Sequence, residues 1–137
     1  MRLILLNMLA AFLSLAINSS SAQEHSLLNR LDAGAAVFKK CMACHQVGPD
    51  ARNGIGPVLN GVVGRPAGQY PEYSYSSANK TSGLVWDEPT LTRYLHAPGD
   101  VVPGTKMIFF GLKKDQELAD IVAYLKRFDR DGNVANP

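Results

Sequence analysis

The feature that most constrains this chain is a pentapeptide that contains both of its cysteines. The stretch reads Cys41-Met42-Ala43-Cys44-His45, so a histidine follows the second thiol without a gap. This C-x-x-C-H pattern is the attachment signal of a c-type haem, because each thiol can bond to one vinyl group of the same porphyrin. The adjacent imidazole can then ligate the iron. The pattern predicts one haem c, bound covalently through Cys41 and Cys44, with His45 as an axial ligand.

Three other uses of the cysteine pair fit the sequence less well. A disulfide between Cys41 and Cys44 would close a very short loop and stabilise little, because the stabilisation grows with loop length. A zinc site needs about four ligands, and the other histidines, His25 and His96, lie in unrelated contexts. A thioredoxin-like redox pair needs a βαβ setting, which the sequence does not predict.

The N-terminus is typical of a secretory signal peptide. Met1-Arg2 is a positive start, an apolar run follows from Leu3 to Ile17, and small residues stand at Ser20 and Ala22. We predict a cleaved signal peptide over residues 1–22 and export to the periplasm. An uncleaved membrane anchor is the alternative. It is less favoured, because the apolar run falls short of the ~20 residues that span a bilayer.

The remainder has the composition of one globular domain, since the chain is 46% hydrophobic and 19% charged. Its net charge of +2 is too small to indicate binding to nucleic acid or to an anionic membrane. We predict a polar leader over residues 23–31, a single domain over 32–129 and a tail over 130–137.

The spacing of apolar residues predicts an all-α domain. A helical pattern runs from Leu31 directly into Cys41. A second helix is capped by Asp87, has Pro89 in its first turn and ends at Pro98. No segment alternates well enough to predict a strand.

The last helix has the clearest amphipathic pattern, and we expect Asp115 to cap it. Its apolar stripe is Leu118, Ile121, Val122, Leu125 and Phe128. A short helix is expected over residues 76–80. Two segments rich in glycine and proline, residues 46–68 and 101–111, are predicted to be loops that pack against the haem.

The second axial position of the iron decides the function. An open position means gas binding or peroxide chemistry, whereas a second strong ligand means electron transfer. The candidates are Met42, Met107, His25 and His96. Met42 lies between the two cysteines on the side of His45, His25 is in the leader, and His96 is interpreted as an exposed residue at a helix end. Met107 remains, with a gap-filling core methionine as its alternative interpretation.

Taken together, these motifs resemble the class I cytochromes c, in the group of mitochondrial cytochrome c and bacterial cytochrome c2. The residues that carry the resemblance are Cys41-Met42-Ala43-Cys44-His45, Gly56-Pro57, Gly68 to Asn79, Pro103 to Phe109 and Ala119 to Lys126. The resemblance implies the class I cytochrome c fold, with three main helices, additional short ones and long loops wrapped around one haem.

The resemblance also implies roles for individual residues. Pro57 would accept a hydrogen bond from the ring of His45. The haem propionates would be held by Arg65, Tyr75 and Trp86. A polar network beside Met107 would be formed by Asn79, Tyr94 and Thr105. Gly34 would meet Tyr124 where the terminal helices cross.

The expected function is that of a soluble one-electron carrier with a low-spin haem c held by His45 and Met107, not an enzyme. We expect a monomer whose partners are redox proteins such as a cytochrome bc1-type reductase and a terminal oxidase, reductase or reaction centre. The lysines expected near the exposed haem edge are Lys39, Lys40, Lys106, Lys113 and Lys114. The alternatives are the haem subunit of a periplasmic dehydrogenase, a peroxidase-type enzyme and a gas-binding module.

Overall fold

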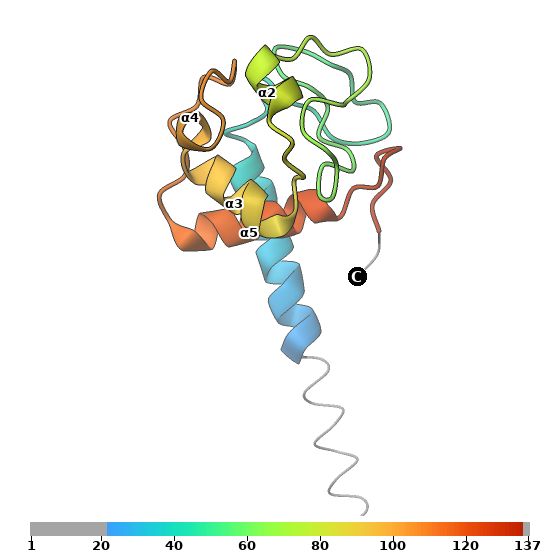
Figure 1. The fold of residues 1–137 in the computed structure, drawn as a ribbon. Coiled ribbons are helices and arrows are strands. Elements are labelled where there is room, and N and C mark those ends of the chain that lie inside the picture. The colour runs from blue at the N-terminus through green and yellow to red at the C-terminus, as the bar shows by residue number, and fades with distance from the viewer. Residues whose placement is uncertain (1–21, 136–137) are drawn as a thin grey trace, which may run out of the picture.

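The computed structural model describes residues 22–135, so nearly all of the predicted signal peptide lies outside the described residues. The helices are a long N-terminal helix over residues 22–38, α2 (Ser77–Thr81), α3 (Glu88–His96), α4 (Pro98–Val101) and α5 (Asp115–Lys126). Between residues 22 and 135, strand pairing is limited to two isolated bridges, Pro66 with Val85 and Phe128 with Val134. The prediction of an all-α domain with three main helices and long loops is confirmed (Figure 1). In this part of the chain no helix is long and apolar enough to cross a membrane.

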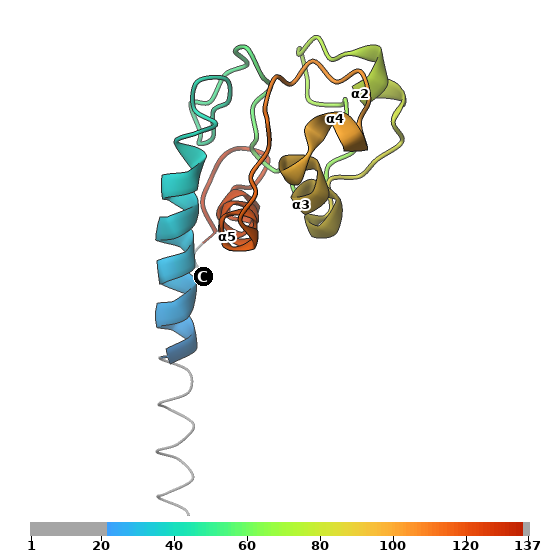
Figure 2. The ribbon, with the colours of Figure 1, turned by 90° about the vertical axis from the view of Figure 1, so that its left-hand side faces the viewer.

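The N-terminal helix and α5 pack together at Gly34. Figure 2 shows α5 end-on beside the N-terminal helix. A Cβ atom at Gly34 would collide with the carbonyl oxygen of Asp120 and would lie 2.6 Å from the Cβ atom of Tyr124. One turn further along, the ring of Phe38 lies 5.4 Å from the ring of Tyr124. The expected contact between Gly34 and Tyr124 is therefore present, and the absence of a side chain allows it.

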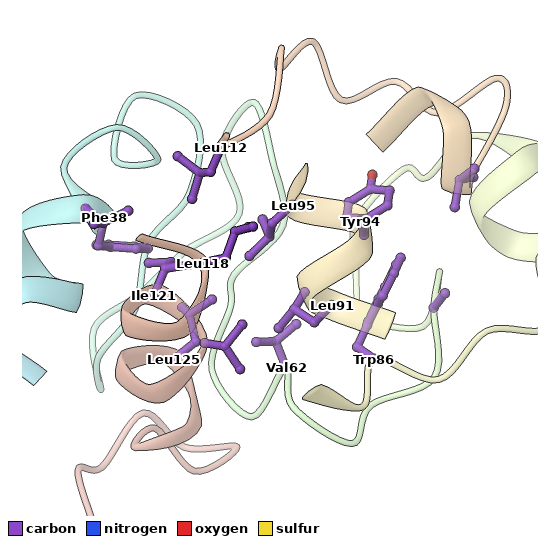
Figure 3. Packing of buried hydrophobic residues seen from close by; sticks show 14 residues of the cluster. Phe38, Val62, Trp86, Leu91, Tyr94, Leu95, Leu112, Leu118, Ile121 and Leu125 are labelled. Carbon is purple, nitrogen blue, oxygen red and sulfur yellow. The ribbon is translucent and has the colours of Figure 1, made fainter. Parts of the chain in front are cut away.

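The core lies between α3 and α5. Figure 3 shows Leu91 and Leu95 of α3 on one side and Ile121 and Leu125 of α5 on the other, with Val62 between them. All five residues of the predicted apolar stripe are buried. Four of them lie on one face of α5, which packs against the interior of the domain, whereas Phe128 lies beyond the end of the helix at Lys126 and forms a bridge with Val134.

The predicted cap of α3 is confirmed, whereas α2 begins one residue later than predicted. The Ser76 hydroxyl accepts from the backbone N–H of Asn79 at 3.2 Å and caps α2, which runs over Ser77–Thr81 instead of residues 76–80. The Asp87 carboxylate accepts from the backbone N–H of Thr90 at 2.8 Å and caps α3. Each cap satisfies a donor that the first turn of a helix leaves without an intrahelical partner.

Three details differ from the predictions. Residues 23–29 of the predicted leader are helical and exposed, so the helix extends upstream of its predicted start at Leu31, because extending an existing helix costs little even for polar side chains. The N-cap of α5 is Lys114 and makes no side-chain cap. Asp115 is instead the first helical residue, where its charge still favours the positive end of the helix dipole. The helix before Pro98 ends as predicted, with His96 as its last residue, but Pro98 also begins the short helix α4, which the sequence does not predict, since proline fits the first turn of a helix.

Candidate functional site

A cavity of about 340 Å³ opens between α3, α5, the pentapeptide and the loop that carries Met107. Its walls are mostly apolar, and they include Leu91 and Leu95 of α3 and Leu125 of α5, which Figure 3 labels. The cavity brings together every site residue named from the sequence: Cys41, Cys44, His45, Pro57, Arg65, Tyr75, Asn79, Trp86, Tyr94, Thr105 and Met107. The other ligand candidates, Met42, His25 and His96, do not line it, and all three are exposed.

The pentapeptide presents its three reactive side chains from a tight turn that follows the N-terminal helix. The backbone N–H groups of Cys44 and His45 both donate to the carbonyl of Cys41, at 3.0 and 2.9 Å. This turn directs both thiols and the imidazole to the same cavity. Burial raises the pKa of the Cys41 thiol.

The ring of His45 is fixed by the backbone of the loop that follows the pentapeptide. Its Nδ1 lies 2.7 Å from the carbonyl oxygen of Pro57. Because a carbonyl can only accept, Nδ1 carries the proton and Nε2 keeps the lone pair that a metal needs. Burial lowers the pKa of His45, although the hydrogen bond to Pro57 opposes that shift. Gly56 allows this packing, since a Cβ there would collide with the imidazole.

Thr105 is the centre of a polar network beside Met107. Its hydroxyl oxygen accepts from Asn79 Nδ2 at 3.1 Å and from the backbone N–H of Met107 at 3.2 Å. A hydroxyl has two acceptor positions and one proton. The third contact, with the Tyr94 hydroxyl at 2.9 Å, is therefore one in which Thr105 donates. Burial raises the pKa of Tyr94, although its hydrogen bond with Thr105 opposes that shift. The network holds the backbone that carries Met107.

Arg65 places a positive charge in the cavity wall. Its two terminal nitrogens donate to the carbonyls of Asn60 at 2.9 Å and Val58 at 3.1 Å. The guanidinium lies over the ring of Tyr70, 4.7 Å from its centroid. Its Nε is buried and has no hydrogen-bond partner among residues 22–135. A buried N–H without a partner is costly, so this wall fits an acidic group such as a haem propionate.

Tyr75 and Trp86 complete this part of the wall. The Tyr75 hydroxyl accepts from the backbone N–H of Tyr70 at 3.3 Å, and burial raises the pKa of the phenol. Trp86 is buried and packs its ring 4.6 Å from that of Tyr94. These residues thus line the same cavity as Arg65, where the resemblance implies a contact with the propionates.

The sequence does not reveal the residues that hold the loop around His45 and Arg65. Gly56 belongs to a motif, but nothing in the sequence shows that it provides the space for the imidazole. Asn60, whose carbonyl accepts from Arg65, is not singled out by any pattern. Tyr73 donates to the carbonyl of Ile55 at 2.6 Å, and the sequence shows only a tyrosine-rich stretch there. A tight backbone approach and an asparagine in a loop carry no sequence signal of their own.

Comparison with known proteins decides the family. The family model described as cytochrome c matches residues 31–129. The chain belongs to the cytochrome c family. It is 55% identical over 102 residues to cytochrome c2 of Rhodoblastus acidophilus, across 74% of this chain and 95% of that protein. It is 49% identical over 104 residues to cytochrome c-550 of Nitrobacter winogradskyi, across 76% of this chain and 95% of the relative.

A solved structure agrees with this assignment. The structure of cytochrome c2 from Rhodospirillum centenum superposes with a TM-score of 0.69 at 42% identity, covering 72% of this chain and 98% of that one. As a cytochrome c with a C-x-x-C-H pentapeptide, the protein carries one haem c bound covalently through Cys41 and Cys44. It is an electron carrier and not an enzyme.

Proposed function

We propose that this cytochrome is a soluble periplasmic one-electron carrier whose haem iron is ligated by His45 and Met107. The observation that carries the proposal is that both side chains line one cavity together with the two cysteines, whereas the rival ligands lie outside it. When bound, the haem supplies a ferric–ferrous couple, and a thioether ligand favours the ferrous state relative to a second histidine.

The protein's own residues would limit rearrangement during electron transfer. Pro57 holds the proton of His45 on Nδ1, so the ligating nitrogen keeps its direction. Thr105 anchors the backbone of Met107. Apolar walls from α3 and α5 would keep water away from a haem bound between them. Arg65, Tyr75 and Trp86 would receive the propionates, and the buried Nε of Arg65, which lacks a partner among residues 22–135, supports that role.

The surface near the opening would meet redox partners of opposite charge, such as a cytochrome bc1-type reductase and a terminal oxidase, reductase or reaction centre. Lys106 lines the cavity, and its Nζ donates to the carbonyl of Ser74 at 3.1 Å. Beside it, Ile108 and Phe110 are almost fully exposed. An apolar centre with charged neighbours suits brief, steered encounters. Cleavage of the signal peptide after Ala22 would release the protein to the periplasm.

The ligand assignment is tested by replacing each of two methionines in the oxidised protein. His–Met ferric haem has a weak near-infrared charge-transfer band, which we expect in the wild type and expect Met107→Ala to abolish. Met42→Ala is the matched control, because Met42 is 61% exposed and does not line the cavity. A wild-type ferric protein with a high-spin spectrum would contradict the proposal.

A further inference from the structure

One short loop segment holds both His45 and Arg65. Its carbonyls accept from two different charged or ligating groups: Pro57 accepts from His45 Nδ1, and Val58 and Asn60 accept from Arg65. The position of the guanidinium in the cavity wall therefore depends on where the backbone of residues 57–60 lies. Any group that holds the backbone of residues 57–60 in place from the side away from the cavity therefore also holds Arg65 in place.

The side chain of Asn60 fixes it. Asn60 is 5% exposed and does not line the cavity. Its Oδ1 accepts from the backbone N–H of Gly48 at 2.8 Å, and its Nδ2 donates to the carbonyl of Gly48 at 2.8 Å. The amide thus pairs with both polar groups of one residue, as a neighbouring strand would. This pairing joins the segment to the loop that leaves the pentapeptide.

The C-terminal turn, residues 129–133, closes over this pair from outside. A Cβ at Gly132 would collide with the backbone of Gly48 and would lie 2.6 Å from Nδ2 of Asn60. Next to Asn60, the backbone N–H of Gly61 donates to the carbonyl of Phe128 at 3.1 Å. The turn is itself held by the Asp129 carboxylate, which accepts from the backbone N–H groups of Asp131 and Asn133 at 2.9 and 2.8 Å. Asn60 is therefore enclosed on both sides.

We propose that Asn60 is a positioning residue for Arg65 and, through it, raises the reduction potential of the haem. The inference rests on the proposed haem site and adds to it a residue that touches no part of the cavity. A guanidinium held against the propionates disfavours the more positive ferric state. When Asn60 no longer ties the segment to Gly48, Arg65 gains freedom to move toward water, where its charge is screened.

A double-mutant cycle on the holoprotein tests the proposal, with the midpoint potential measured by spectroelectrochemistry. We expect Arg65→Gln to lower the potential. We expect Asn60→Ala to lower it by a smaller amount, equivalent to about a threefold shift of the reduction equilibrium toward the ferric form. In the Arg65→Gln background, Asn60→Ala should leave the potential unchanged. Asn60→Ala should reduce the free energy of unfolding in both backgrounds, because that loss reports the missing hydrogen bonds between Asn60 and Gly48.

The controls separate positioning from general loosening. Asn133→Ala changes the same residue type in the C-terminal turn and removes only a contact with Asp129 at 3.2 Å, so the potential should stay at the wild-type value. Gly132→Ala is the substitute experiment where Asn60→Ala does not yield folded protein. It pushes the turn away from Asn60 while leaving the cavity residues unchanged, and we expect it to lower the potential.

Three outcomes would overturn the inference, and they differ in what they leave standing. If Arg65→Gln lowers the potential but neither Asn60→Ala nor Gly132→Ala does, Asn60 is only structural and the proposed haem site stands. If Asn60→Ala lowers the potential equally in both backgrounds, Asn60 acts without Arg65, so the inference fails while the proposed haem site stands. If Arg65→Gln itself leaves the potential unchanged, the proposed role of Arg65 fails together with the inference.

Discussion

At Gly56 the backbone passes so close to the imidazole of His45 that no side chain fits between them. A Cβ atom there would come within 2.7 Å of both ring nitrogens. The following carbonyl, that of Pro57, accepts the ring proton. The ring can neither move away from Gly56 without breaking that bond nor move toward it.

We therefore expect Gly56→Ala to destabilise the folded holoprotein by about 3 kcal/mol, since overpacking of this size forces a shift of a ring that is fixed on two sides. Denaturant unfolding followed by haem absorbance would measure this loss. Gly54→Ala is the control, because a Cβ at Gly54 meets its nearest neighbour, the Cys44 carbonyl oxygen, at an ordinary 3.5 Å. Equal stability of the two variants would contradict the expectation.

Among individual residues, the sequence predicts those whose side chains can bond to a haem or ligate its iron. Cys41, Cys44 and His45 are identified by spacing alone, and Met107 follows by elimination among four candidates. Asn60 could not be predicted, because its importance comes from a buried amide paired with Gly48. That pairing depends on two loops meeting in space.

Among the helices, the contact between the N-terminal helix and α5 depends on one glycine. We expect Gly34→Ala to cost about 3 kcal/mol of unfolding free energy, because its Cβ would collide with backbone of α5 that cannot move freely. Thermal unfolding would show the loss. Gly99→Ala is matched to it, since Gly99 also lies in a helix and a Cβ there would meet no described atom within 4 Å. A stability equal to the wild type in Gly34→Ala would exclude this close approach.

The helices also show which sequence signals are reliable. The start of α3 can be predicted because Asp87 caps it with its own side chain. The predicted start of α2 is one residue early, because Ser76 is the cap of that helix and not its first residue. The predicted cap of α5 lies one residue late, because the real N-cap, Lys114, makes no side-chain bond and so leaves no signal. The helical state of residues 23–29 escapes prediction for a related reason. Polar residues give no periodic pattern, yet they continue a helix that apolar residues downstream have fixed.

Across the whole molecule, the lysines expected around the haem edge differ in whether they pair with an acidic residue. Lys40 and Lys114 both pair with Glu117, at 2.7 and 3.8 Å. The hydrogen bond from Lys40 lowers the pKa of Glu117, which stays charged and offsets part of their field. Lys106 and Lys113 donate to the backbone carbonyls of Ser74 and His96, and neither has an acidic partner within residues 22–135.

We expect the oxidation of the ferrous protein by ferricyanide to slow as salt is added, because anions are steered to these lysines at low ionic strength. Stopped-flow rates should fall about tenfold between very low salt and about 1 M salt. Lys106→Gln should reduce the slope. Lys126→Gln should not, since Lys126 pairs with Glu88 and does not line the cavity. Rates that do not depend on ionic strength would contradict a steering role.

The cavity between α3 and α5 also makes the fold depend on its cofactor. Leu91, Leu95, Ile121 and Leu125 belong to the core and line the cavity at the same time. Without a bound group, the atoms on the cavity side of these residues lose the packing contacts that a close-packed interior provides. We therefore expect the chain without its cofactor to unfold at a lower denaturant concentration than the holoprotein.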